Sequence, residues 1–165
     1  MPKCEVLQIA MVCAGHNSSR SVVTVVKSLL FYRKHPVHLH FLTDPPTQTI
    51  LQTVFETWLL NQGMTFVLEF SHRESLIAAM IRYTKWWSVF DRISVFSVKV
   101  SFYDLNTVVE QVEWIPNKHY SGVYGLLKLT LPNILPKWLT KIIVLDTDVI
   151  LATDISKVSE YRISS

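Results

Sequence analysis

Two carboxylates one residue apart, Asp146 and Asp148, are the residues of this chain best suited to chemistry. They follow the apolar run 142–145, and a short apolar run bounded by polar residues is typical of a strand buried on both faces. Ligands of open α/β sheets collect at the carboxyl ends of such strands. Carboxylate oxygens suit Mg²⁺ or Mn²⁺, which complete their shell with water and phosphate. The pair therefore indicates part of a metal–diphosphate site, although Asp-x-Asp alone is equally compatible with a solvated turn.

Alternating strand and helix patterns predict the elements that position this pair. Asn17 or Ser18 can cap a first helix that ends before Pro36, and Asp44 can cap a second helix that has Pro45 at its first position. Strands alternating with helices predict a largely parallel sheet with right-handed crossovers. The first loop and the Asp146 loop would then share one edge of the sheet. The expected strands are 6–12, 38–42, 98–103 and 142–145, and a helix-like segment is expected at 120–131.

Composition sets limits on the class of protein. The 165 residues, 49% of them hydrophobic, predict one domain with a modest core. The mild net charge of +3 is spread along the chain and does not indicate a nucleic-acid surface. Cys4 and Cys13 lack metal-site spacing and are expected to be buried thiols. No apolar run is long enough to span a bilayer, and Glu5 interrupts any signal peptide near Met1, so no secretory signal or anchor is expected in this sequence.

The strand–helix rhythm breaks between residues 61 and 97. Basic residues alternate there with tryptophans, and residues 75–87 fit one amphipathic helix. A basic helix that carries tryptophan can bind a membrane surface or a partner protein. The simpler interpretation is an inserted helix with no specific role.

Three stretches together resemble a known family. They are Trp114-Ile115-Pro116-Asn117-Lys118-His119-Tyr120-Ser121-Gly122-Val123-Tyr124-Gly125-Leu126-Leu127-Lys128-Leu129, the first-strand segment 12–20, and Ile143-Val144-Leu145-Asp146-Thr147-Asp148. The chain is similar here to the amino-terminal catalytic domain of the LARGE-type xylosyl- and glucuronyltransferases of glycosyltransferase family 8. The resemblance covers about residues 4–60 and 98–157.

The resemblance implies a GT-A (Rossmann-like) nucleotide-sugar-binding fold, incomplete at the carboxyl terminus. It also implies a retaining, Mn²⁺-dependent transfer of xylose from UDP-xylose to glucuronate in the O-mannosyl glycan of α-dystroglycan, in the Golgi. Residue by residue, Asp146 and Asp148 match the metal-binding motif. The nucleotide-sugar-binding positions that it implies are Ala14, Gly15, Asn17, Asp44, Lys128 and Thr147.

Chemistry agrees with these positions. Cleavage of the sugar–phosphate bond places negative charge on UDP, which a divalent ion and a nearby lysine can stabilise. Gly15 would let the backbone approach the nucleotide, or would simply serve a turn after the strand. Lys128 could instead extend into solvent. His38 and His40 lie on one face of a strand without a third ligand, so we assign them no metal-binding role.

The sequence departs from the family in three ways. Residues 61–97 are expected to be a non-family insert and 158–165 a non-family tail within a single partial domain, 1–165. The family also continues well past the aspartate pair, so we expect a fragment whose activity is impaired. Two alternatives stay open: a non-catalytic UDP-binding or partner-binding fragment, and another family 8 xylosyl- or glucosyltransferase.

Overall fold

A five-stranded sheet forms the centre of the protein in the computed structural model, which describes residues 6–61, 66–70, 98–118 and 122–160. The strand order is β3-β4-β2-β1-β5, and each pairing in it is parallel. This confirms the predicted α/β class and agrees with a GT-A, Rossmann-like domain. The strands are β1 Leu7–Cys13, β2 Val37–Thr43, β3 Phe66–Phe70, β4 Val98–Asp104 and β5 Ile143–Leu145.

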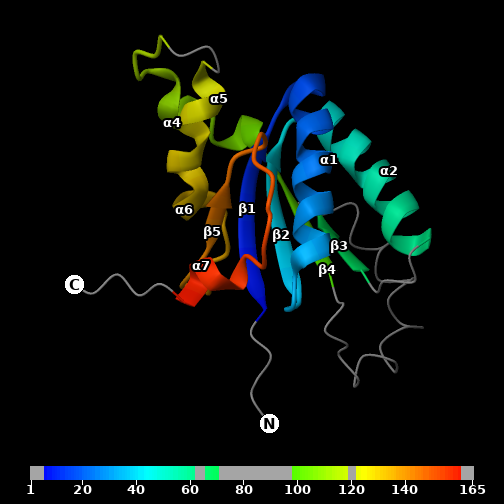
Figure 1. Ribbon diagram of the computed structural model, residues 1–165. Helices are drawn as coiled ribbons and strands as arrows, with labels where there is room; N and C mark the ends of the chain where they lie inside the picture. Colours follow the sequence, from blue (N-terminus) through cyan, green and yellow to red (C-terminus); the bar gives the residue numbers. More distant parts are fainter. Residues whose placement is uncertain (1–5, 62–65, 71–97, 119–121, 161–165) are drawn as a thin grey trace.

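Helices cover both faces of this sheet (Figure 1). Two long helices, α1 (Gly15–Tyr32) and α2 (Pro45–Asn61), lie on one face, and short helical segments lie on the other. These short segments are η2 Leu105–Thr107, α4 Glu110–Glu113, α5 Val123–Leu126, η3 Leu127–Thr130 and α6 Leu131–Ile134, and α7 Ser156–Glu160 follows β5. No helix in the described ranges is both long and apolar enough to cross a membrane.

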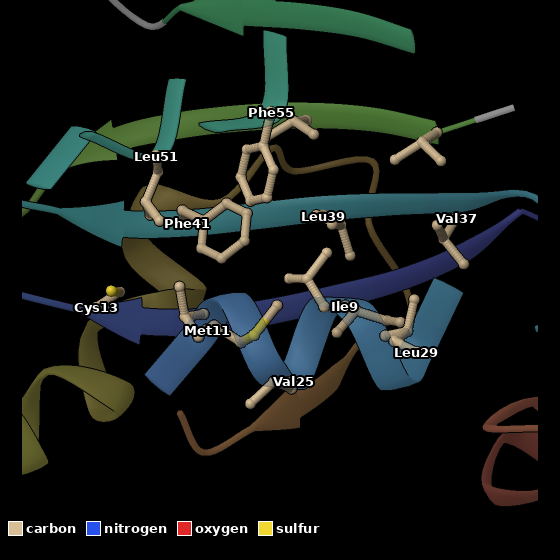
Figure 2. Close-up of a cluster of buried hydrophobic side chains, with 14 of the residues drawn as sticks. Ile9, Met11, Cys13, Val25, Leu29, Val37, Leu39, Phe41, Leu51 and Phe55 are labelled. Atoms are coloured by element: carbon tan, nitrogen blue, oxygen red, sulfur yellow. The ribbon is translucent and has the colours of Figure 1, made fainter. Parts of the chain in front are cut away.

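The main hydrophobic core lies between the sheet and the two long helices (Figure 2). Alternate residues of β1, β2 and β4 point to this face, as the two-residue period of a strand requires. Phe41 of β2 stacks on Phe55 of α2 with ring centroids 5.5 Å apart, and on Phe102 of β4 at 5.7 Å. These buried rings attach α2 to the centre of the sheet and thereby fix the direction in which its amino terminus points.

The chain changes direction across the sheet at β1. From β1 it passes through α1 to β2, and β4 and β3 follow outward on that side, whereas β5 pairs with the opposite edge of β1. Loops that leave two adjacent parallel strands in opposite directions open a crevice at the carboxyl ends of those strands. The fold therefore places its preferred ligand position between the ends of β1 and β5.

A buried polar cluster occupies the opposite face of the sheet. His38 Nε2 lies 2.7 Å from Ser101 Oγ, and His40 joins the Tyr103 hydroxyl through Nδ1 and the Gln8 Oε1 atom through Nε2, each at 2.9 Å. A glutamine Oε1 only accepts, so His40 donates from Nε2 and can accept the Tyr103 proton at Nδ1 as a neutral ring. The two imidazole centroids lie 3.8 Å apart. Both histidines are buried core residues whose ring nitrogens bond neighbouring side chains.

Several sequence predictions need correction. Helix α1 begins at Gly15, before Asn17 and Ser18, and Ala14 takes the N-cap position without a side-chain hydrogen bond. The helix-like segment expected at 120–131 is helical in its described part but divides into α5, η3 and α6, and the buried residues Leu127, Leu131 and Leu135 keep a spacing of four. Strand β3, inside the expected insert, was not anticipated.

The helix expected at 75–87 lies outside the described residues. In the expected tail, α7 continues to Glu160, and 161–165 also lie outside the described residues. Assignment of 61–97 and 158–165 as non-family segments stays a prediction.

Burial of His38 makes stability depend on pH. Desolvation, reinforced by His40 and Lys99, lowers the pKa of His38 to about 3 from 6.5. Below about pH 6.5 His38 is protonated in the unfolded chain but stays neutral in the folded chain until the pH approaches 3. The free energy of unfolding therefore falls as the pH falls through this range. The free energy of unfolding, measured in urea, should be lower at pH 4.5 than at pH 6.5, and His38 should account for about 2–3 kcal/mol of that difference.

The variant His38→Gln should lose that part of the pH dependence, and His16→Gln, which removes an exposed histidine, should keep it. An unchanged pH dependence in His38→Gln would contradict the assignment.

Candidate functional site

Lys128 and Asp146 form an ion pair at the carboxyl end of β5. Asp146 follows the last residue of β5, Leu145, which pairs with Met11 in β1. Lys128 lies on η3, where its neighbour Leu127 is fully buried. The lysine and aspartate side chains are 35% and 59% exposed, so solvent reaches both partners of the pair. The η3 segment thus places a cation directly on the first carboxylate of the Asp-x-Asp motif.

The loop after β1 reaches the same place. Ser18 in the first turn of α1 donates from its hydroxyl to Thr147 Oγ1 at 3.5 Å, a long hydrogen bond that joins this turn to the Asp-x-Asp loop. The sequence singled out Ser18 only as a possible cap of the first helix, and did not assign it to the site. Residues 129 positions apart in sequence are thereby brought into one site.

Asp44, at the end of β2, ties the β1 loop to α2. One carboxylate oxygen accepts the Gly15 backbone N–H at 3.2 Å, and the other accepts the Thr47 backbone N–H at 3.1 Å. The second bond is the helix cap expected for Asp44 before Pro45. The first was not foreseen: it uses the Gly15 N–H that could otherwise have faced a ligand.

Gly15 has a backbone conformation that favours glycine. Its φ is +77°, a region that other residues adopt only at a cost. A Cβ added there would meet no atom within 4 Å, so packing does not require a glycine. The backbone angle explains the residue, and open space remains beside it for a ligand.

The remaining predicted residues lie nearby without such contacts. Ala14 is half-buried beneath the loop, and Asn17 and Asp148 are exposed. Within the described part of the chain, the Asn17 and Asp148 side chains make no hydrogen bond or ion pair. The structure therefore links three separate pairs, Gly15 with Asp44, Ser18 with Thr147 and Lys128 with Asp146, and leaves Asn17 and Asp148 exposed.

Cys13 lies under this loop as a buried free thiol. Burial raises its pKa to about 11, offset in part by a hydrogen bond with Ser18, and Asp44 raises it further. A thiol with this pKa is almost wholly protonated at neutral pH and a poor nucleophile. Cys13 is therefore a packing residue, as expected.

The segment that carries the strongest family resemblance is closed by one hydrogen bond. Asn117 donates from its side-chain amide to the Gly122 carbonyl, and Gly122 has a positive φ of 54°. Residues 119–121 between them, which include the His119 and Tyr120 of the sequence motif, lie outside the described residues. Helix α5 begins directly after Gly122 and leads into η3, which carries Lys128.

The donor set fits a divalent ion that shares its shell with a ligand. Asp146 and Asp148 offer hard carboxylate oxygens, and the Lys128 ammonium already stands where positive charge is favoured. The described residues contain no group of three or more His, Cys, Asp or Glu arranged to hold a metal. Two carboxylates suit Mg²⁺ or Mn²⁺, which keep water and phosphate oxygens as their other ligands.

A hollow of about 230 Å³ lies elsewhere, lined by Val6 to Gln8 and by residues 138–143. It opens at the amino ends of β1 and β5, opposite the Asp-x-Asp loop. Nothing connects it to the aspartate pair, so it is not part of the candidate site.

Comparison with known proteins gives clear similarities. The chain is 48% identical over 156 residues to the human xylosyl- and glucuronyltransferase LARGE2. The aligned region covers 94% of this chain and 17% of that protein. It is 46% identical over 155 residues to chicken LARGE2s, with 94% and 16% covered. For human LARGE1 the identity is 41% over 155 residues, with the same coverage of 94% and 16%. The chain thus spans only about a sixth of the length of these relatives. No protein-family model matches it.

Removal of the Asp44 carboxylate should destabilise the chain. Asp44→Ala leaves the Thr47 and Gly15 N–H groups without their acceptor and should cost about 1–2 kcal/mol in urea unfolding. Asp44→Asn keeps one acceptor oxygen and should cost less. As a control, Asp148→Ala removes an exposed carboxylate that has no partner in the described ranges, and should change stability by less than about 0.5 kcal/mol. Equal stability of Asp44→Ala and Asp148→Ala would contradict this account.

Proposed function

We infer that this chain, a homologue of one segment of the LARGE-type xylosyl- and glucuronyltransferases, carries the nucleotide-sugar-binding part of a glycosyltransferase of that family. Similarity extends over 94% of the chain. The observation that supports a working site is the meeting of the Asp-x-Asp loop, the β1 loop and Lys128 where the chain changes direction between β1 and β5.

The proposed chemistry is glycosyl transfer from a UDP-sugar. Asp146 and Asp148 would hold Mn²⁺, which supplies a Lewis acid for the diphosphate leaving group. Lys128 would add a second positive charge beside the departing phosphate oxygens. The open surface at Gly15, beside Ala14 and Asn17, would receive the nucleoside. Asp44 holds this surface by binding the Gly15 N–H.

Finer assignments belong to the same proposal. The donor would be UDP-xylose, the acceptor glucuronate on the O-mannosyl glycan of α-dystroglycan, and the compartment the Golgi, with retention of anomeric configuration. These assignments rest on the family resemblance of 114–129 and of the Asp-x-Asp segment. We assign the binding of donor and metal to this chain.

Calorimetric titration of UDP, with and without Mn²⁺, tests this function on the intact chain. We expect binding that requires Mn²⁺ and weakens at least about tenfold in Asp146→Asn and Asp148→Asn, because each variant removes one anionic ligand. Asp104→Asn is the matched control: its carboxylate also follows a strand, β4, but caps η2 by accepting the Asn106 N–H at 2.9 Å.

UDP binding should be unchanged in Asp104→Asn. A folded wild-type chain that binds no UDP in the presence of Mn²⁺ would refute the proposed function, and binding equally weakened by all three substitutions would show that the aspartate pair is not the site.

A further inference from the structure

We propose that Lys128 is an internal counter-ion of the metal site, which occupies Asp146 in the free chain and must be displaced before a divalent cation can bind there. This inference rests on the proposed function, because it concerns the same site. It adds a step to that function: cation entry is an exchange of one positive charge for another.

The contact itself is the first argument. The Lys128 ammonium lies on Asp146 Oδ1, whereas Asp148, the other carboxylate of the motif, has no ion-pair partner within the described residues. One carboxylate of the pair is therefore neutralised and the other is not. A divalent ion that binds Asp146 at that oxygen meets the positive charge of the Lys128 ammonium at close range, so the two cations repel each other and compete for the carboxylate.

The second argument is that Lys128 can move while its backbone stays in place. Leu127 before it is fully buried, and Thr130 is buried with its hydroxyl bonded to the Leu127 carbonyl at 2.8 Å. The ammonium, in contrast, ends a flexible four-carbon stem that is 35% exposed. The lysine can therefore leave Asp146 without unfolding η3.

The third argument is energetic. An ion pair between partly exposed groups contributes little to stability, so a divalent ion can displace it readily. The exchange leaves a positive charge beside the bound ion, where an anionic diphosphate would receive it. Lys128 should therefore weaken the binding of metal alone and strengthen the binding of metal together with UDP.

The test uses Lys128→Met, which keeps the length of the stem and removes the charge. Mn²⁺ affinity in the absence of nucleotide, measured from the free Mn²⁺ signal in electron paramagnetic resonance, should rise about two- to fivefold because the competing charge is gone. UDP affinity in saturating Mn²⁺ should fall about tenfold. Lys137→Met removes the same charge from an exposed position that follows α6 and should change neither affinity.

Outcomes separate the two proposals. If the wild-type chain binds Mn²⁺ with UDP but Lys128→Met binds Mn²⁺ alone no more tightly, Lys128 is not a counter-ion and the proposed function stands. If the variant gains Mn²⁺ affinity and keeps its UDP affinity, the competition is confirmed and the diphosphate role of Lys128 is refuted. If neither protein binds Mn²⁺, both proposals fail.

A second measurement needs no variant. A carbodiimide adds to the Asp146 carboxyl group to give an O-acylisourea. The Lys128 amine attacks its acyl carbon, forming an amide and releasing a urea, so the contact can be trapped as a cross-link. Mass spectrometry should find the Lys128–Asp146 cross-link in the free wild-type chain and several times less of it in saturating Mn²⁺. A cross-link yield that Mn²⁺ binding leaves unchanged would overturn the inference.

Discussion

The parallel pairing of β1 with β5 is the constraint on which the site depends. Its register places Leu145 opposite Met11, so the Asp-x-Asp loop begins beside the last residues of β1. Because β2 and β4 lie on the other side of β1, the two loops leave in opposite directions and do not fill the space between them. The Ser18–Thr147 hydrogen bond is the direct result of this pairing. A shift of β5 by one residue would exchange the faces of all its side chains and separate these loops.

Charge at the site is balanced in a way that leaves one carboxylate available. Lys128 neutralises Asp146, Asp44 uses its carboxylate oxygens on backbone N–H groups, and Asp148 remains exposed. Asp44 and Asp146 thus have different partners, and Asp148 has none among the described residues. This arrangement suits a site that is stable without a cation and can accept one, since no cluster of unpaired buried charge has to be tolerated in the free chain.

The two faces of the sheet contribute differently to stability. The face beneath α1 and α2 is apolar, with stacked phenylalanines at its centre. The other face combines a second apolar cluster with the bonded group of His38, His40, Ser101, Tyr103 and Gln8. A polar group of this kind is tolerated only when its members bond one another, and it links three neighbouring strands. It therefore fixes which strands are neighbours, whereas the apolar core fixes the helices.

Local patterns in the sequence predicted the α/β class, four of the strands, the cap of α2 and the position of the aspartate pair after a strand. The other residues assigned to the site were implied by the family resemblance, and their roles stay a prediction. Strand β3 was missed although Phe66–Phe70 is a short apolar run typical of a strand, because the segment was assigned to an insert, and only the tertiary structure shows that it pairs with β4. Nor could the sequence predict that Asp44 binds Gly15 or that Lys128 binds Asp146, which lie 29 and 18 residues apart. Local sequence determines which groups are present, and only the order of strands in the tertiary structure decides which of them meet.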